Sequence, residues 1–357
     1  MKLKLNLPLW TLITPLLACI SYSFTHTNIW TEIIAGVFLI GSVLAAVFHA
    51  ETIAHKIGEP FGTIVLALSI TVLEVALIIS LMIAGGKGAE TLPRDTVFAA
   101  IMLILNGILG SCLLLGGAKY HEQFFGKSSA NTALITLVAI LVLSLVLPNF
   151  TTSIQGPYYN TKQLIFIAVV SLVLYSSFII VQTIRHKDYF VTEEDKEVEE
   201  SHKHIPMRTI IVSFVFLLIC LTMVVLMSKA LSPSIEGLVV SLGAPPSFVG
   251  VIIAAIVLLP EGLSAIKAAR KNQLQTSLNL TLGSALASIG LTIPAVSIVC
   301  IFFDMNIVLG LDLKSMVLLA LSIFISMLAL NQGKTNILYG IVLLVNLSAY
   351  LFTVLVP

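Results

Sequence analysis

Two glutamates lie in the middle of long apolar runs of the sequence. Glu74 lies within the run 68–76, and Glu261 directly follows the run Ile256–Pro260. Of the 18 acidic residues, only these two lie deep inside an apolar run, and no Lys or Arg occupies a similar position. A charged group at the centre of a membrane helix costs about 2.5–3.5 kcal/mol on insertion scales. Each glutamate is therefore expected to face a cavity, a polar partner or a cation.

Two buried carboxylates without a basic partner have a definite ion chemistry. Burial favours the protonated carboxyl, whereas a bound cation favours the ionised carboxylate. Two protons or one divalent ion each neutralise the pair, so protons and metal compete for the same oxygens. This competition produces antiport, provided that the empty, charged site does not readily change its facing direction. The alternative is a pair of permanently protonated glutamates that hold helices together by hydrogen bonds.

Further oxygen ligands are expected near the glutamates, because Ca²⁺ takes about 6–8 oxygens. Pro260 lacks a backbone N–H and is expected to break its helix locally, which would free carbonyls beside Glu261. Hydroxyls and amides on the adjoining helices are the candidate supporting ligands, namely Ser69, Thr71, Asn106, Ser111, Asn279, Ser284 and Ser288.

Part of this polar set has a second interpretation. Four hydroxyls follow one stripe of a single helix and are typical of contacts between helices; they are Ser277, Thr281, Ser284 and Ser288. Gly107, Gly110 and Gly283 are expected to be close-packing positions and not ligands.

A second titratable group precedes the Glu74 run. It consists of His49, Glu51, His55 and Glu59. We expect these residues at the cytoplasmic mouth, where they would collect protons or cations. An interfacial cap without transport function is the alternative.

Composition identifies the class of protein. Of 357 residues, 58% are hydrophobic and 10% charged, and the mean hydropathy is +1.06. Soluble domains carry about 25% charged residues, so a soluble enzyme is excluded. A net charge of +1 with scattered basic residues excludes a nucleic-acid partner. The four cysteines are far apart, which fits neither a disulfide framework nor a CxxC metal site. No cofactor is expected.

Continuous apolar runs predict an all-α polytopic membrane protein. Eleven runs qualify as spans: Leu9–Phe24, Asn28–Phe48, Gly62–Ala84, Thr96–Gly117, Asn131–Pro148, Lys162–Ile184, Thr209–Met227, Phe248–Ile266, Thr276–Phe303, Asp312–Leu330 and Asn336–Val356. With the N-terminus inside, 14 of the 19 Lys and Arg residues lie on the cytoplasmic side and 5 outside. This bias predicts a protein of the cell (inner) membrane with a cytoplasmic N-terminus and an external C-terminus.

The chain also shows an internal repeat. A shift of 177 residues aligns Arg94–Ser111 with Lys271–Ser288 without a gap. The run before each segment carries one central glutamate, and five helix steps separate these two runs. Because five is odd, the copies would cross the membrane in opposite directions, as in many transporters. We therefore divide the chain into an N-terminal helix, a first five-helix repeat, an acidic cytoplasmic linker and a second five-helix repeat, at 1–27, 28–184, 185–208 and 209–357. The linker is either a solvated segment or a cation or pH sensor.

Several motifs resemble the ChaA-type calcium/proton antiporters, of the cation/proton exchanger branch of the calcium:cation antiporter superfamily. The segment His55–Gly62, followed by the Glu74 run, is similar to the first repeat of that family. Pro260–Leu263 through Gln273, Asn279–Leu280, Gly283–Ser284 and Leu291–Pro294 are similar to the second. The resemblance implies one extra helix plus two inverted five-helix repeats. It also implies Glu74 and Glu261 as the shared cation and proton site, and exchange of Ca²⁺, Na⁺ and K⁺ for H⁺.

The sequence departs from the broader exchanger pattern at the secondary ligands. Thr71 and Leu258 stand where an asparagine is usual, and Ala287 stands where a glutamine is common. The loss of these amide oxygens leaves a monovalent cation open as the substrate.

The predicted function is proton-coupled export of Ca²⁺, with Na⁺ and K⁺ as further substrates, at the paired glutamates. The alternatives are a Na⁺(K⁺)/H⁺ antiporter with little Ca²⁺ activity, a cation channel or uniporter, and a remote one, an intramembrane enzyme. An enzyme is not expected, because Asp304 and Asp312 lie at or near helix ends and all seven histidines lie at span ends or in loops. The expected partners are inorganic cations, protons and the lipid bilayer; the oligomeric state is left open.

Overall fold

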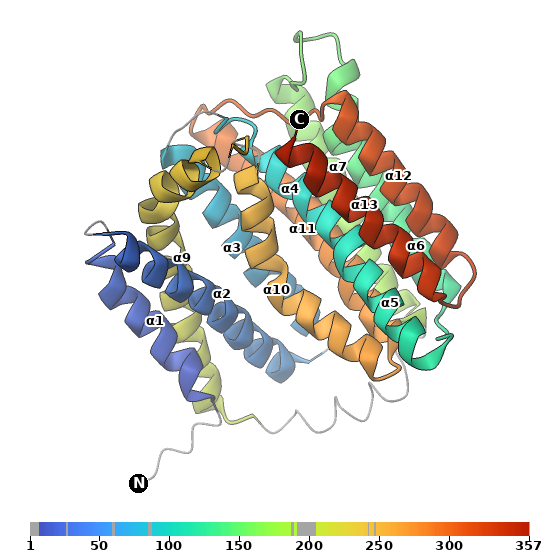
Figure 1. Cartoon of the computed structure of the whole chain (residues 1–357), viewed down its shortest axis with the longest axis horizontal. Helices are drawn as coiled ribbons and strands as arrows, with labels where there is room; N and C mark the ends of the chain where they lie inside the picture. The colour runs from blue at the N-terminus through green and yellow to red at the C-terminus, as the bar shows by residue number, and fades with distance from the viewer. Residues whose placement is uncertain are drawn as a thin grey trace. The chain divides into compact units, whose positions relative to one another are not determined.

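The structure is a computed structural model that describes residues 7–25, 28–58, 61–84, 88–186, 189–190, 205–241, 243–245 and 248–356. Its regular elements are helices (Figure 1). Their bounds are α1 Leu9–Tyr22, α2 Ile29–Ile57, α3 Phe61–Ala84, α4 Leu92–Met102, η1 Leu103–Ile108, α5 Leu109–Tyr120, α6 Lys127–Leu141, η2 Val142–Val146, η3 Leu147–Phe150, α7 Thr161–Ile180, η4 Val181–Arg185, α9 Met207–Ser241, α10 Phe248–Arg270, α11 Leu274–Phe302, α12 Leu313–Leu330 and α13 Ile337–Leu355.

Several of these elements join end to end. The π-helical segment η1 connects α4 to α5, the segments η2 and η3 extend α6, and η4 extends α7. The described residues therefore form eleven continuous helices, which confirms the predicted all-α polytopic fold. Ten of them are long and apolar enough to cross a membrane. The exception is α1, whose 14 residues rise about 21 Å, less than the ~30 Å of a hydrocarbon core.

Two helices run further than predicted. The span expected to end at Phe48 continues as α2 to Ile57, and the span expected to end at Met227 continues as α9 to Ser241. Hydropathy falls where polar residues begin, but the backbone bonds of a helix do not require apolar side chains. Most of the acidic linker lies outside the described residues, so both interpretations of it stay predictions.

Contacts between residues divide the chain into two compact units. Unit 1 comprises Met1–Ala89 and Glu193–Leu242, and unit 2 comprises Glu90–Thr192 and Gly243–Pro357. The helices of unit 1 are α1, α2, α3 and α9, and the remaining helices belong to unit 2. Each unit therefore combines helices from the first and the second half of the chain.

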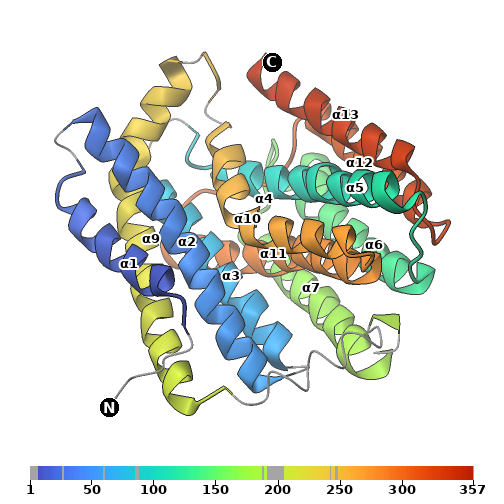
Figure 2. The ribbon, with the colours of Figure 1, turned by 60° about the horizontal axis from the view of Figure 1, so that its bottom comes forward.

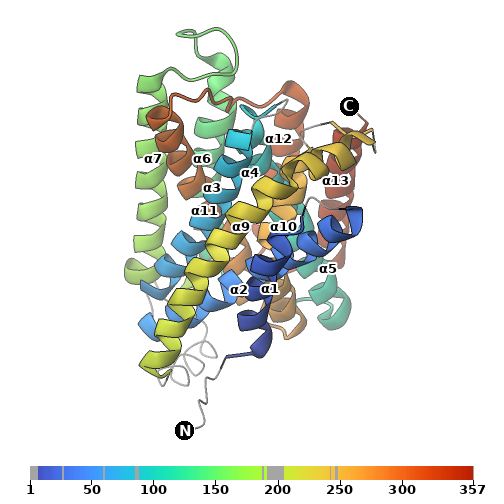
Figure 3. The same ribbon diagram turned by 90° about the vertical axis from the view of Figure 1, so that its left-hand side faces the viewer.

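In unit 1, α2 is the central helix. It packs along α9, α1 and α3, and the views in Figures 2 and 3 agree on this neighbourhood of α1, α2 and α9. The amide oxygen of Asn28 accepts a hydrogen bond from the Thr31 N–H (3.1 Å) and caps the start of α2. Ser80 Oγ on α3 donates to the Val225 carbonyl on α9 (3.2 Å) and links these two helices.

In unit 2, the continuous helix α4–η1–α5 contacts α10, α11 and α13. Small residues make the closest approaches, which confirms the close packing predicted for Gly107 and Gly110. A Cβ at Gly107 would lie 3.2 Å from Leu347 Cδ2, and one at Gly110 would lie 3.0 Å from Leu343 Cβ on α13. The same prediction for Gly283 is wrong, because a Cβ there would meet no heavy atom within 4 Å.

The loops of unit 2 separate into two sets, at the two ends of its helices. At one end, the loop after α5 meets the loop after α12, because the Phe125 N–H donates to the Gly333 carbonyl (3.0 Å). The loop after α5 also meets the loop after α10, since Gln123 Nε2 donates to Asn272 Oδ1 (3.0 Å). At the other end, the loop after α3 meets the loop after α11, because the Val308 N–H donates to the Glu90 carbonyl (2.9 Å). The loops after α5, α10 and α12 thus meet one another, and so do the loops after α3 and α11. This is the arrangement expected when successive helices cross the membrane in alternating directions.

Candidate functional site

Glu74 lies in the middle of α3, and only 3% of its surface is exposed. The Thr71 hydroxyl donates to the Ala67 carbonyl (2.8 Å), and the Ser69 hydroxyl donates to the Val65 carbonyl (2.8 Å). These bonds use the hydroxyl protons and leave oxygen lone pairs for a cation. Thr71 is three residues from Glu74 and shares its face of the helix, whereas Ser69 is about 140° away around the axis.

Glu261 lies in α10, and both of its carboxylate oxygens are buried. The expectation that Pro260 breaks this helix is wrong, because α10 is helical from Phe248 to Arg270 with the proline inside it. The missing N–H of Pro260 removes only the bond to the Ile256 carbonyl, four residues earlier. Next to the glutamate, Gly262 allows close packing against η1, since a Cβ there would lie 3.2 Å from Ile108 Cδ1.

Asn106, a predicted supporting ligand, lies in η1 and is fully buried. Its Nδ2 donates to the Met102 carbonyl (3.1 Å) and to Ser322 Oγ on α12 (2.9 Å). Its Oδ1 accepts a hydrogen bond from Asn346 Nδ2 on α13 (2.9 Å), which also donates to Ser322 Oγ (2.8 Å). We call Asn106, Ser322 and Asn346 the Asn106 cluster. The amide of Asn106 is thus bonded to two outer helices of unit 2.

Ser322 and Asn346 were not among the predicted site residues. Each is a polar residue in the middle of an otherwise apolar span, and this is the signal that could have identified them. Their partner could not be predicted, because it depends on which faces of α12 and α13 turn toward η1.

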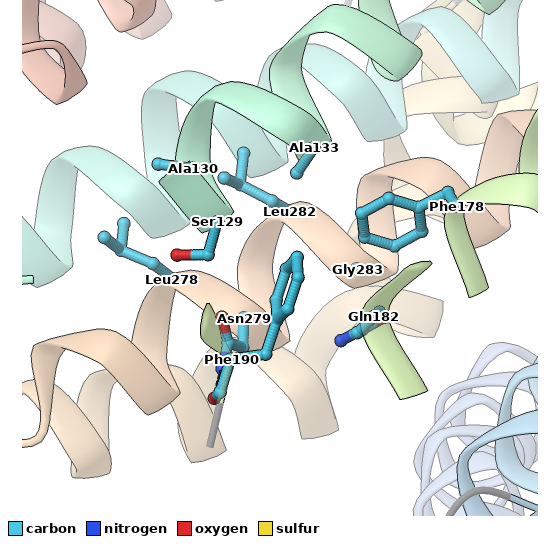
Figure 4. Close-up of a pocket in the computed structure, with 10 residues that line it drawn as sticks. All are labelled: Ser129, Ala130, Ala133, Phe178, Gln182, Phe190, Leu278, Asn279, Leu282 and Gly283. Atoms are coloured by element: carbon cyan, nitrogen blue, oxygen red, sulfur yellow. Dashed lines mark hydrogen bonds between the residues drawn. The ribbon is translucent and has the colours of Figure 1, made fainter. Parts of the chain in front are cut away.

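Asn279 lines a small pocket of unit 2, between α6, α7 and α11 (Figure 4). Its Nδ2 donates to the Phe190 carbonyl, and its Oδ1 accepts a hydrogen bond from Gln275 Nε2 (2.9 Å). Figure 4 shows Phe190 beside Asn279, and Phe190 is only 5% exposed. Both groups of the Asn279 amide are therefore engaged, and neither of these bonds involves Glu261.

The hydroxyl stripe of α11 is largely enclosed. Ser277, Thr281 and Ser288 are buried, and Ser284 is half-buried. The Thr281 hydroxyl donates to the Ser277 carbonyl of the same helix (2.7 Å). Ser111, on α5, is half-buried. The proposed ligand roles of Ser111, Ser284 and Ser288 stay predictions.

The residues predicted at the cytoplasmic mouth do not share one environment. His49 is completely buried, and its Nε2 lies 3.2 Å from the Thr11 carbonyl of α1. Glu51 is half-buried and His55 is exposed, both on α2, while Glu59 lies outside the described residues. His49 is thus placed for a contact between helices and not on an open surface.

The described residues contain no group of three or more His, Cys, Asp or Glu side chains that could hold a metal ion.

An all-helical membrane protein with buried carboxylates in two spans has the architecture of an ion transporter. The family described as sodium/calcium exchanger protein matches residues 27–184 and 212–356. The chain belongs to this family, whose members transport ions and are not enzymes.

Sequence relatives agree with this membership. The chain is 41% identical over 358 residues to y4hA of Sinorhizobium fredii, named as an ionic transporter, and the match covers 99% of the chain and 97% of the relative. It is 34% identical over 326 residues to the sodium-potassium/proton antiporter ChaA of Escherichia coli, covering 90% and 88% of the two chains. The fold is similar to the solved structure of native YfkE, with a TM-score of 0.74, 19% identity and 98% and 99% coverage.

Proposed function

We propose that the protein is a proton-coupled cation antiporter in which Glu74 and Glu261 carry the exchanged ions. One observation carries the proposal: both carboxylates are buried in the middle of membrane-spanning helices. Each occupies the span that precedes a repeated segment, and no Lys or Arg is present in α3 or in the first 19 residues of α10. The resemblance to ChaA supports the proton as the counter-ion.

The exchange follows from charge balance at buried oxygens. An ionised carboxylate in an apolar environment is unfavourable, so each glutamate binds either a proton or a cation. Cation release leaves a charge that protons neutralise, and proton release leaves one that a cation neutralises. Thr71 provides a neutral oxygen on the same helix face as Glu74 and so supports cation binding there.

We propose Ca²⁺ as an exported cation, with Na⁺ and K⁺ as further substrates. Ca²⁺ is favoured by carboxylate ligands, which hard cations prefer, and by the family as a whole. A second candidate is exchange of Na⁺ and K⁺ with little Ca²⁺ activity. The amides of Asn106 and Asn279 favour it, because both are engaged in other bonds and Ca²⁺ requires more oxygen ligands.

The test uses everted membrane vesicles with a preformed proton gradient and a pH-sensitive dye. Addition of Ca²⁺, Na⁺ or K⁺ is expected to dissipate the gradient in the wild type. Glu74→Gln and Glu261→Gln should each reduce this response to background, because an amide cannot exchange a proton. The matched control is Glu122→Gln, which removes an exposed acid that pairs with Lys334 (2.8 Å) and should leave the response unchanged. Full activity in either of the two site variants would reject the proposal.

The response to a panel of cations separates the two candidates. A response to micromolar Ca²⁺ supports divalent exchange, whereas a response to millimolar Na⁺ or K⁺ alone supports the second candidate. Cation flux without any proton movement would identify a channel or uniporter instead.

We also propose a location in the cell (inner) membrane with a cytoplasmic N-terminus. This orientation is supported by the excess of Lys and Arg in the loops that follow α2, α5, α7, α10 and α12.

A further inference from the structure

The Asn106 cluster has one consistent hydrogen-bond assignment. The Met102 carbonyl only accepts hydrogen bonds, so the Asn106 nitrogen must face it (3.1 Å). The Asn106 oxygen then faces α13 and requires a donor, which fixes the Asn346 nitrogen toward it (2.9 Å). Ser322 Oγ accepts hydrogen bonds from both amides and donates to the Leu318 carbonyl (2.7 Å). This hydroxyl therefore uses its full hydrogen-bonding capacity.

The cluster holds a helix segment with unusual geometry. Leu103–Ile108 is π-helical, and the Leu109 N–H following it bonds to the Ile104 carbonyl, five residues back. The π-helix is rare, appears mostly as single turns inside α-helices and occurs often at functional sites. Asn106 lies inside this segment, so its bonds to α12 and α13 fix the segment from one side.

The opposite side of the same segment lies against the helix of Glu261. Ile108 is two residues from Asn106, which places it on roughly the opposite face of the helix. A Cβ at Gly262 would lie 3.2 Å from Ile108 Cδ1 and 3.4 Å from Ile108 Cγ1. Ile108 therefore packs directly on the α10 backbone, one residue after Glu261. All the residues in this chain of contacts belong to unit 2.

We propose that Ser322 and Asn346 are positioning residues for ion exchange. They fix the π-helical segment through Asn106, and Ile108 on its other face fixes the backbone beside Glu261. This positioning role presupposes the ion-carrying role of Glu261 proposed above.

The first experiment compares two buried serines of unit 2 in purified protein reconstituted into liposomes. Ser322→Ala removes the hydroxyl that joins both amides. The matched control is Ser171→Ala. Ser171 lies on α7 and is 1% exposed, and its Oγ lies 3.4 Å from Ser144 Oγ on η2, the segment that extends α6. Ser322→Ala is expected to change the half-maximal cation concentration by about two- to thirtyfold, the range for coupling through packed contacts. It should also displace the pH profile of exchange, while Ser171→Ala changes neither.

A second experiment tests the contact that transmits the position. Gly262→Ala places a methyl group against Ile108 Cδ1 and is expected to shift the same two quantities. Ile108→Val removes that carbon, so the double variant Gly262→Ala/Ile108→Val should recover wild-type values. These variants leave the Asn106 cluster intact, so they remain informative if Ser322→Ala does not fold.

The outcomes separate this proposal from the proposed function. If Glu261→Gln abolishes exchange but Ser322→Ala and Gly262→Ala leave the cation dependence and pH profile unchanged, the glutamate carries ions and the positioning role is overturned. Equal shifts in Ser322→Ala and Ser171→Ala would also overturn it, because they would indicate a general packing effect. If Glu261→Gln remains active, the proposed function itself fails.

Discussion

His49 and Pro15 illustrate how single residues compensate for one another within unit 1. Pro15 lies inside α1 and has no N–H, so the Thr11 carbonyl four residues earlier has no donor in its own helix. The His49 Nε2–H, on α2, fills this role at 3.2 Å. Phe216 lies against the imidazole, with 5.7 Å between ring centroids. The predicted mouth residue thus joins the short first helix to the centre of its unit.

His49→Leu should lower the free energy of unfolding by about 1–3 kcal/mol, because it leaves the buried Thr11 carbonyl without a donor. Adding Pro15→Ala restores an N–H within α1 and should recover much of this loss. Thermal unfolding in detergent measures both effects, with Pro15→Ala alone as the control. A double variant as unstable as His49→Leu would show that the carbonyl is not the cause.

At this scale the sequence predicted burial better than contacts. A carboxylate inside an apolar run has to be enclosed whatever its neighbours are, and both glutamates are. The bonds of Asn106 and Asn279 depend instead on the rotation of α12, α13 and the segment around Phe190. Neighbouring residues in the sequence contain no information on that rotation, so the hydrogen bonds of these two candidate ligands could not be predicted.

Among the elements, helix–helix contact in unit 2 depends on glycine where two backbones approach. A Cβ at Gly340 on α13 would lie 2.6 Å from the Gly110 carbonyl oxygen and 2.7 Å from Leu114 Cα. Both are backbone atoms, which cannot move aside as a flexible side chain can. Gly340 thus allows α13 to pack closely on α5, beside the Asn106 cluster.

Gly340→Ala is expected to destabilise the protein by about 1–3 kcal/mol through overpacking. Gly283→Ala is the control within another helix, since its new methyl group would meet no atom within 4 Å and alanine favours helix by about 1 kcal/mol. The melting temperature should therefore fall for Gly340→Ala and stay equal or rise for Gly283→Ala. Equal melting temperatures for Gly340→Ala and the wild type would contradict this reading of the contact.

Helix number was predictable, whereas helix detail was not. Apolar runs of about 20 residues have to be helices in a bilayer, because every backbone group must be bonded internally. The π-helical segments at 103–108, 142–146 and 181–185 have no comparable signal. The same applies to the helix extensions beyond Phe48 and Met227, where hydropathy ends before the helix does.

For the whole molecule, the loops of unit 2 define two opposite ends. At one end, Lys334 Nζ lies 2.8 Å from Glu122 Oε1, between the loops before α6 and α13. The Glu122 carboxylate raises the pKa of Lys334. This favourable interaction is therefore present below the ordinary lysine pKa and is lost only as pH rises through the raised value. At the other end, Arg94 donates to the Gly310 carbonyl (2.9 Å) and binds Asp95 (2.8 Å).

Cysteine labelling tests the two ends and the orientation together. In a variant that lacks the four native cysteines, Glu122→Cys and Lys334→Cys should react only with reagent supplied on the cytoplasmic side. Ser153→Cys and Lys314→Cys lie in exposed positions at the other end and should react only from outside. A reversed pattern would invert the proposed orientation. Labelling of Glu122→Cys and Lys334→Cys from different sides would contradict alternate crossing.

The division into units has a consequence for biosynthesis. Unit 1 needs α9 to cover α2, yet the ribosome produces α4 to α7, which belong to unit 2, before α9 emerges. Unit 2 in turn waits for α10 to α13. Neither unit can therefore close during synthesis of the first half of the polypeptide. Unit 1 becomes complete only when α9 has been made, and unit 2 only when α10 to α13 have been made. Two separately expressed halves, cut between α7 and α9, would each contain parts of both units and could mature only by assembling with one another.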